Sequence, residues 1–162
     1  MLFEIPIDSG FMDIQHACCF RYIPLGSAKS LLQDVFRERY RFLFNDLRFP
    51  ELFRQYAKDR AELMIVIANW PVTRIHHWSA LLKARAIENQ CYVAGVNRIG
   101  IDGTGIKYCG DSTIFDPYGR IIASGNKNET NLITGEISVS ELHEFRKKFP
   151  VLDDSDNFKI EL

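Results

Sequence analysis

The chain has 162 residues, a formal net charge of −1 and 46% hydrophobic residues, which predicts one domain with a sizeable core. This charge gives no support for binding to nucleic acid or to an acidic membrane surface. No apolar run approaches the roughly 20 residues that span a bilayer. The first residues also lack the basic start and long apolar core of a signal peptide, so we expect a cytoplasmic protein.

The four cysteines are not spaced like metal ligands. Cys18 and Cys19 are neighbours, and the nearby His16 does not complete a ligand set. We interpret them as free thiols, as is usual in a cytosolic chain. Cys91 and Cys109 border apolar runs and are expected to be small core residues. We predict neither a metal ion nor a cofactor.

The N-terminal 44 residues show no chemistry that the sequence alone can identify. Residues 1–26 contain scattered prolines and glycines but no persistent period. Ser27 could cap a helix that runs to Tyr40, and residues 42–44 could form a strand.

The stretch from Leu43 to Leu52 organises the rest of the chain. Apolar residues lead into it, and Pro50 stands where the first turn of a helix tolerates a missing N–H. The stretch therefore predicts a strand, a sharp turn and a helix. Such a turn places one residue at the mouth of a pocket, beside the positive end of a helix dipole. That residue is Phe44, which cannot act as a nucleophile, and a plain strand-to-helix connection is the alternative.

Downstream, apolar runs alternate with capped helical periods, which predicts an α/β fold. A glycine-containing loop is expected at 98–105 and a turn at 116–119. We expect buried strands near residues 63–67, 91–97, 112–116, 120–124 and 132–139. We expect helices near residues 50–59, 76–89 and 140–148, with Ser140 capping the last one.

Two positions after the 63–67 run are candidates for ligand contact, because α/β folds place ligands at strand ends. Asn69 could offer an amide and Trp70 a large flat wall; a packed Trp beside a turn-forming Asn-x-Pro is the alternative. Arg98 could bind a carboxylate through its planar fork or face solvent. Arg85 and Glu88 lie three residues apart on a predicted helix and can pair.

Several short motifs follow one another from Asp46 onward. They are Asp46–Glu51, Ile67–Pro71, Trp78, Ala84–Gln90, Gly95–Arg98, Gly110 with Ser112, and Asp116 and Pro117 with Gly119. Their order and spacing resemble the carbon–nitrogen hydrolase, or nitrilase, superfamily, most closely its ω-amidase-like amidohydrolase branch. The resemblance divides the chain into residues 1–44, which show none, and residues 45–162, the C-terminal part of a hydrolase domain.

The nucleophile motif of this family reads Cys, any residue, Asp, Leu-Arg-Phe-Pro-Glu, so Phe44 stands where the cysteine would be. The resemblance implies an α-β-β-α sandwich, of which this chain carries the C-terminal half. It also implies amide hydrolysis by a cysteine thiolate with a lysine and a glutamate from upstream. Glu4 and Lys29 lie in no matching motif and receive no role, so we predict no intact catalytic residue.

The remaining motif residues would shape a pocket for a small amide. The residues predicted to support the turn or to line the pocket are Asp46, Arg48, Asn69 and Trp70. Arg85 and Glu88 are predicted to lie behind these residues and to support them. In the family the helix that carries the last two also helps to form a dimer, so we expect a homo-oligomer.

Three functional interpretations stay open. The chain is an ω-amidase-like hydrolase segment without its nucleophile, or a non-catalytic relative that binds a small amide or a partner subunit. The third is a frame slip just before Asp46, because the cysteine and the resemblance are lost at the same point.

Overall fold

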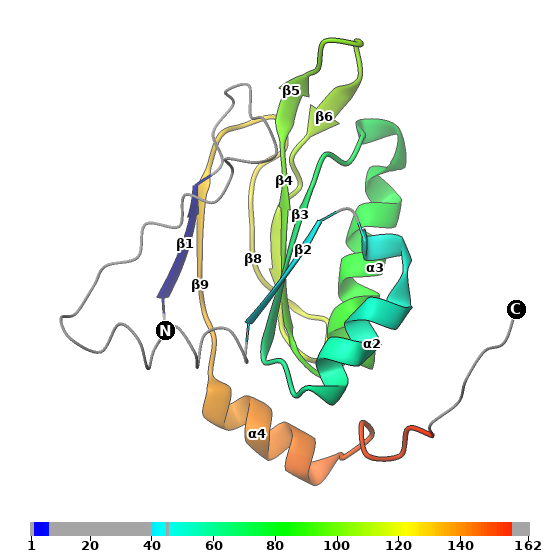
Figure 1. The fold of residues 1–162 in the computed structure, drawn as a ribbon. Helices are drawn as coiled ribbons and strands as arrows, with labels where there is room; N and C mark the ends of the chain where they lie inside the picture. The colour runs from blue at the N-terminus through cyan, green and yellow to red at the C-terminus, as the bar shows by residue number, and fades with distance from the viewer. Residues whose placement is uncertain (1, 7–39, 45, 157–162) are drawn as a thin grey trace, which may run out of the picture.

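The structure is a computed structural model that describes residues 2–6, 40–44 and 46–156. Its centre is a five-stranded sheet with the order β2-β3-β4-β7-β8 (Figure 1). Its strands are β2 (Tyr40–Phe44), β3 (Leu63–Ala68), β4 (Tyr92–Asn97), β7 (Thr113–Phe115) and β8 (Ile121–Ser124). The first three strands run parallel to one another, and β7 and β8 continue the sheet in antiparallel pairing.

Two smaller antiparallel pairs and several helices surround this sheet. The pairs are β1 (Leu2–Pro6) with β9 (Leu132–Glu136), and β5 (Ile99–Ile101) with β6 (Lys107–Cys109). The helices are α2 (Pro50–Lys58), α3 (Ile75–Glu88) and α4 (Val139–Lys148), with short 3-10 turns η1 (Asp46–Arg48) and η2 (Val72–Arg74). Figure 1 shows α2 and α3 on one side of the sheet and β1 and β9 on the other.

The apolar run of β3 is buried on both faces, as expected for a central parallel strand. Met64 and Val66 pack with α2 and α3 in one core cluster. Leu63 and Ile65 point to the opposite face and pack in a second cluster with Ile133 of β9. Alternate side chains of one strand therefore hold both layers of the fold together.

Side chains of α3 pack directly against the backbone of β4 at Gly95, which has no side chain of its own. A Cβ atom at this position would lie 2.2 Å from Leu82 Cδ1 and 2.8 Å from Trp78 Cζ2. A larger residue would push the helix away from the strand, so glycine here sets the separation of helix and sheet.

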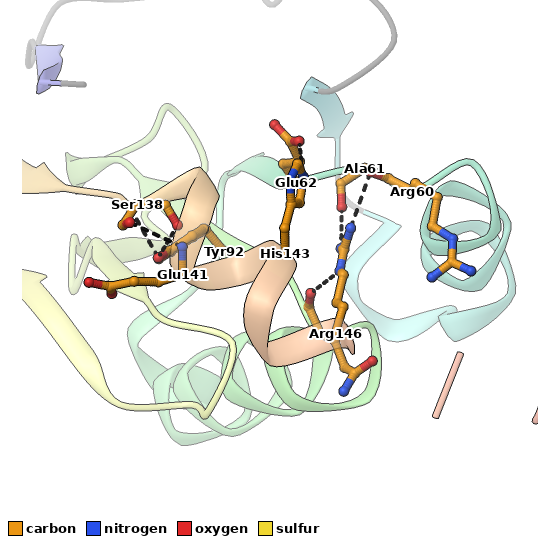
Figure 2. Close-up of polar contacts among 9 residues, drawn as sticks. Arg60, Ala61, Glu62, Tyr92, Ser138, Glu141, His143 and Arg146 are labelled. Carbon is orange, nitrogen blue, oxygen red and sulfur yellow. Dashed lines mark hydrogen bonds and ion pairs between the residues drawn. The ribbon is translucent and has the colours of Figure 1, made fainter. Parts of the chain in front are cut away.

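Helix α4 is fastened to the edge of the sheet where β3 and β4 begin (Figure 2). The buried guanidinium of Arg146 donates to the carbonyl oxygens of Ala61 at 2.6 Å and Gln90 at 2.9 Å, the residues before these strands. His143 Nε2 lies 2.7 Å from Oε1 of the buried Glu62. This polar cluster therefore holds α4 at the opposite edge from the strand ends at Ala68 and Asn97.

The predicted α/β class of the nitrilase type is confirmed, and so are the strand at 63–67 and the turn from Asp116 to Gly119. The three helices begin and end within two residues of their predicted positions. The helix expected from Ser27 lies largely outside the described residues, although Tyr40 at its predicted end begins β2.

Three local predictions are wrong: the end of one strand, the cap of the last helix and one loop. The strand expected at 132–139 ends at Glu136, because Ser138 rather than Ser140 caps α4 by accepting the Glu141 N–H at 3.2 Å. The expected loop at 98–105 begins a hairpin, in which the Asp102 carboxylate accepts the N–H groups of Thr104 and Ile106. Hydrogen bonds, first of all from Thr104, lower the pKa of Asp102 and keep the carboxylate charged.

Candidate functional site

The C-terminal ends of the three parallel strands meet at one edge of the sheet. Phe44 at the end of β2 is in register with Ile67 of β3, and Ala68 at the end of β3 is in register with Asn97 of β4. The 3-10 turn η1 begins at Asp46, and Pro50 opens α2 as predicted. The strand, sharp turn and helix are therefore all present at the edge where α/β folds bind ligands.

The turn is fastened from behind by Arg85 of α3. Its Nη2 atom donates to the carbonyl oxygen of Leu47 at 2.7 Å, and Leu47 is itself fully buried. Its Nη1 atom lies 2.7 Å from Glu88 Oε1, which confirms the predicted pairing. The guanidinium also lies 5.1 Å from the centroid of the Phe53 ring on α2. Arg85 thus ties the turn, α2 and α3 to one another.

Trp70 is packed and also lies beside the turn. Its ring centroid is 5.7 Å from that of Trp78, and its Nε1 donates to the carbonyl oxygen of Arg74 at 2.7 Å. The guanidinium of Arg48, the last residue of η1, lies 4.8 Å from the Trp70 ring centroid. Arg48 Nη2 is also 3.5 Å from Nδ1 of His77. The structure therefore brings Arg48 and Trp70, two of the predicted site residues, into contact.

The other predicted site residues take different places. Asn69 is exposed directly beyond β3, whereas the guanidinium of Arg98 lies 4.8 Å from the centroid of the Tyr108 ring. Phe44 and Asp46 occupy the end of β2 and the start of η1, and their side chains are not among those described.

Sequence reasoning missed Asn97, the most extensively bonded amide at this edge. Its Oδ1 accepts the Trp70 N–H at 2.7 Å, and its Nδ2 donates to the carbonyl oxygens of Trp70 at 3.1 Å and Gly110 at 2.7 Å. The available signal was a polar residue that ends the apolar run of β4. The pairing of Asn97 with Ala68, which places it beside Trp70, is not visible in the sequence.

Positive groups gather around His77. Partial desolvation, followed by the charges of His76, Arg48 and Arg74, lowers the pKa of His77 from its ordinary value of 6.5. The imidazole therefore stays neutral at pH 7, and its neighbours make this part of the edge electropositive.

Neither of the described cysteines lies on the turn. Cys91 precedes β4 at the opposite edge of the sheet, and burial raises the pKa of its thiol to about 12. Burial also raises the pKa of Cys109, which lies at the end of β6. Both are buried free thiols, as predicted for core residues. Within the described ranges, no three His, Cys, Asp or Glu side chains are grouped to hold a metal ion.

The model of the carbon-nitrogen hydrolase family matches residues 43–147. The chain belongs to the carbon–nitrogen hydrolase family. It is 48% identical over 115 residues to the omega-amidase YafV of Escherichia coli, which covers 71% of this chain and 44% of that protein. It is 42% identical over 109 residues to the 2-oxoglutaramate amidase of Bacillus subtilis, which covers 67% of this chain and 41% of that protein.

Solved structures of carbon–nitrogen hydrolases share this fold. A superfamily protein of Xanthomonas campestris, with an arsenic adduct in its active site, superposes with a TM-score of 0.67 and 38% identity. That match covers 75% of this chain and 48% of the other. The C. elegans NitFhit protein gives a TM-score of 0.64 at 31% identity, covering 70% of this chain and 28% of the other. The chain spans less than half the length of these relatives.

The described part of this carbon–nitrogen hydrolase chain includes the sheet edge where β2, β3 and β4 end. The side chains that meet there are Arg48, Trp70, His77 and Asn97, with Arg85 behind them. None of the helices in the described part is both long and apolar enough to cross a membrane.

The positive charge of Arg48 is one measurable cause of the low His77 pKa. In Arg48→Ala, the pKa of His77 should rise towards its ordinary value, because a nearby cation no longer opposes protonation of the ring. NMR titration of the His77 ring protons measures the shift. Arg54→Ala is the matched control, because Arg54 lies near Glu88 and is not among the charges that act on His77. A His77 pKa that stays constant or falls in Arg48→Ala would refute this electrostatic account.

Proposed function

We propose that this chain is an ω-amidase-like segment of a carbon–nitrogen hydrolase, which supplies the nucleophile turn and one wall of the site for a small amide. The observation that carries the proposal is the turn between β2 and α2, held by the bond from Arg85 to the Leu47 carbonyl oxygen. The similarity to YafV and to a 2-oxoglutaramate amidase supports an amide as the ligand.

The family resemblance implies a covalent mechanism. A cysteine thiolate at the turn attacks the amide carbonyl, and the leaving amine takes a proton and departs as ammonia. Water then attacks the resulting thioester and releases the acid. A lysine lowers the thiol pKa and holds the oxyanion, while a glutamate transfers protons. Neither of these two groups is assigned to a residue of this chain.

We propose that the chain as written does not hydrolyse amides by itself. Phe44 occupies the nucleophile position, and a benzyl side chain cannot form an acyl-enzyme. Loss of a covalent nucleophile typically removes many orders of magnitude of rate. Arg48 and Trp70 would still shape the wall of the site.

A non-catalytic relative is the second candidate, favoured by the same Phe44. Such a protein would use the edge near Trp70 to bind a small amide or a partner subunit. A frame slip before Asp46 is the third, and sequencing of the encoding locus tests it. If no alternative frame encodes a cysteine before Asp46 and a glutamate and lysine further upstream, the frame slip is excluded.

Release of ammonia from a panel of short ω-amides tests the proposed function. The unmodified chain should release none, and Phe44→Cys alone should release none, because the lysine and glutamate are not supplied. Phe44→Cys together with the N-terminal half of a family member should be active, because the described turn and Trp70 are then completed by the missing groups.

Two outcomes would contradict this assignment. Turnover by the unmodified chain that is abolished in Cys91→Ala or Cys109→Ala would show that the nucleophile lies elsewhere. Turnover that survives replacement of all four cysteines would exclude the family mechanism for this chain.

We also propose that the chain associates with further copies of itself. The second core cluster has a partly exposed margin, which consists of Ile67, Val96, Ile122 and Ala123. Contact with another copy would remove this apolar surface from water. Light scattering after size-exclusion chromatography should show an oligomer, and a stable, monodisperse monomer would count against the proposal.

We also propose that the protein is cytoplasmic. The free thiols of Cys91 and Cys109 support this location, because thiols persist in a reducing compartment. Fractionation of cells that express the chain would test it, and recovery in a secreted or membrane fraction would contradict it.

A further inference from the structure

Asn97 is the last residue of β4 and is fully buried. It is in register with Ala68, at the point where the ladder between β3 and β4 ends. Beyond this point, the Asn97 side chain forms the hydrogen bonds that the backbone of a paired strand would form. Oδ1 accepts the N–H of Trp70 at 2.7 Å, and Nδ2 donates to the carbonyl oxygen of the same residue at 3.1 Å. The amide thus extends the sheet by holding both backbone groups of Trp70.

The same amide also holds a second loop. Nδ2 donates to the carbonyl oxygen of Gly110 at 2.7 Å, in a turn where Gly110 and Asp111 both have left-handed backbone angles, with φ values of 74° and 62°. A non-glycine residue rarely adopts this conformation unless its surroundings fix it. The carbonyl oxygen of Asp111 accepts the indole N–H of Trp78 at 2.9 Å. Asn97 therefore joins the loop of Trp70 to the loop that Trp78 contacts.

Ser112 keeps Asn97 itself in place. Its hydroxyl oxygen accepts the Asn97 N–H at 3.0 Å and lies 3.3 Å from the Asn97 carbonyl oxygen, to which it donates. No other common residue would reproduce the arrangement, since aspartate lacks the donors, glutamine is longer, and leucine would leave three backbone groups unpaired in a buried place.

We propose that Asn97 is a positioning residue that sets the Trp70 wall of the amide site. The chain of contacts runs from the Asn97 amide to the Trp70 backbone, and from the Trp70 ring to the Arg48 guanidinium at 4.8 Å on the nucleophile turn. The functional part of this inference rests on the proposed function, because it assumes that Trp70 faces the amide. The positioning itself can be measured without ligand or turnover.

Hydrogen exchange at the two indole N–H groups tests the inference in the full chain, which contains two tryptophans. In Asn97→Leu, both indole hydrogens should exchange about tenfold faster than in the unmodified chain, because both loops open locally. The backbone amides of β4 should not show this extra acceleration. NMR measures the indole and amide rates in the same sample.

Asn89→Leu is the matched control. Asn89 is also buried, but its Nδ2 donates to the Arg85 carbonyl oxygen at the end of α3, at the opposite edge of the sheet. A general loss of stability should accelerate hydrogen exchange at the indole groups and at the β4 amides by the same factor. We expect this pattern in Asn89→Leu. If Asn97→Leu shows the common factor as well, the positioning role is wrong.

Ser112→Ala keeps the test decisive if Asn97→Leu does not fold. This variant retains the Asn97 amide and removes only the hydroxyl that fixes its backbone. The indole hydrogens should then exchange about threefold faster relative to the amides of β4 other than that of Asn97, whose acceptor is the removed hydroxyl. An unchanged ratio would overturn the proposal. If Phe44→Cys joined to the N-terminal half of a family member releases no ammonia while the indole exchange rates change as expected, the proposed function is rejected and the positioning role stands.

Discussion

The parallel pairing of β2, β3 and β4 is the constraint on which the rest of the structure depends. Parallel strands end at the same edge of a sheet, so three segments far apart in the sequence must leave the sheet side by side. The first turns sharply into α2, the second carries Trp70, and the third ends at Asn97. Each segment alone is an ordinary connection, and their common edge makes them a candidate site.

Buried polar side chains fix the loops at both edges of the sheet. Arg85 and Asn97 bond to backbone groups near the strand ends, and Arg146 does the same where β3 and β4 begin. Buried carbonyl groups need such partners, because an unpaired one costs about 1–3 kcal/mol. These side chains thus hold loops in one conformation that hydrophobic packing alone would not determine.

The sequence predicted what depends on local patterns. The continuous apolar run at 63–67 indicated a central strand, and Pro50 indicated the start of α2, because burial and proline geometry leave direct traces in sequence. The prediction that Ser140 caps α4 failed, since Ser138 is an equally plausible cap and the end of β9 decides between them. Asn97 was missed because its role depends on its register with Ala68, and strand register cannot be read from a single sequence.

We propose that the described residues form the turn of the nucleophile motif but do not activate a nucleophile. The thiol pKa in Phe44→Cys tests this most directly, from the pH dependence of its alkylation rate. Mass spectrometry of the peptide that contains residue 44 separates it from the chain's own four cysteines. We expect a thiol pKa near the ordinary value of about 8.5, because the activating lysine of the family mechanism is not assigned to any residue of this chain. A pKa below about 7 would contradict the account, since the chain alone would then generate a reactive thiolate.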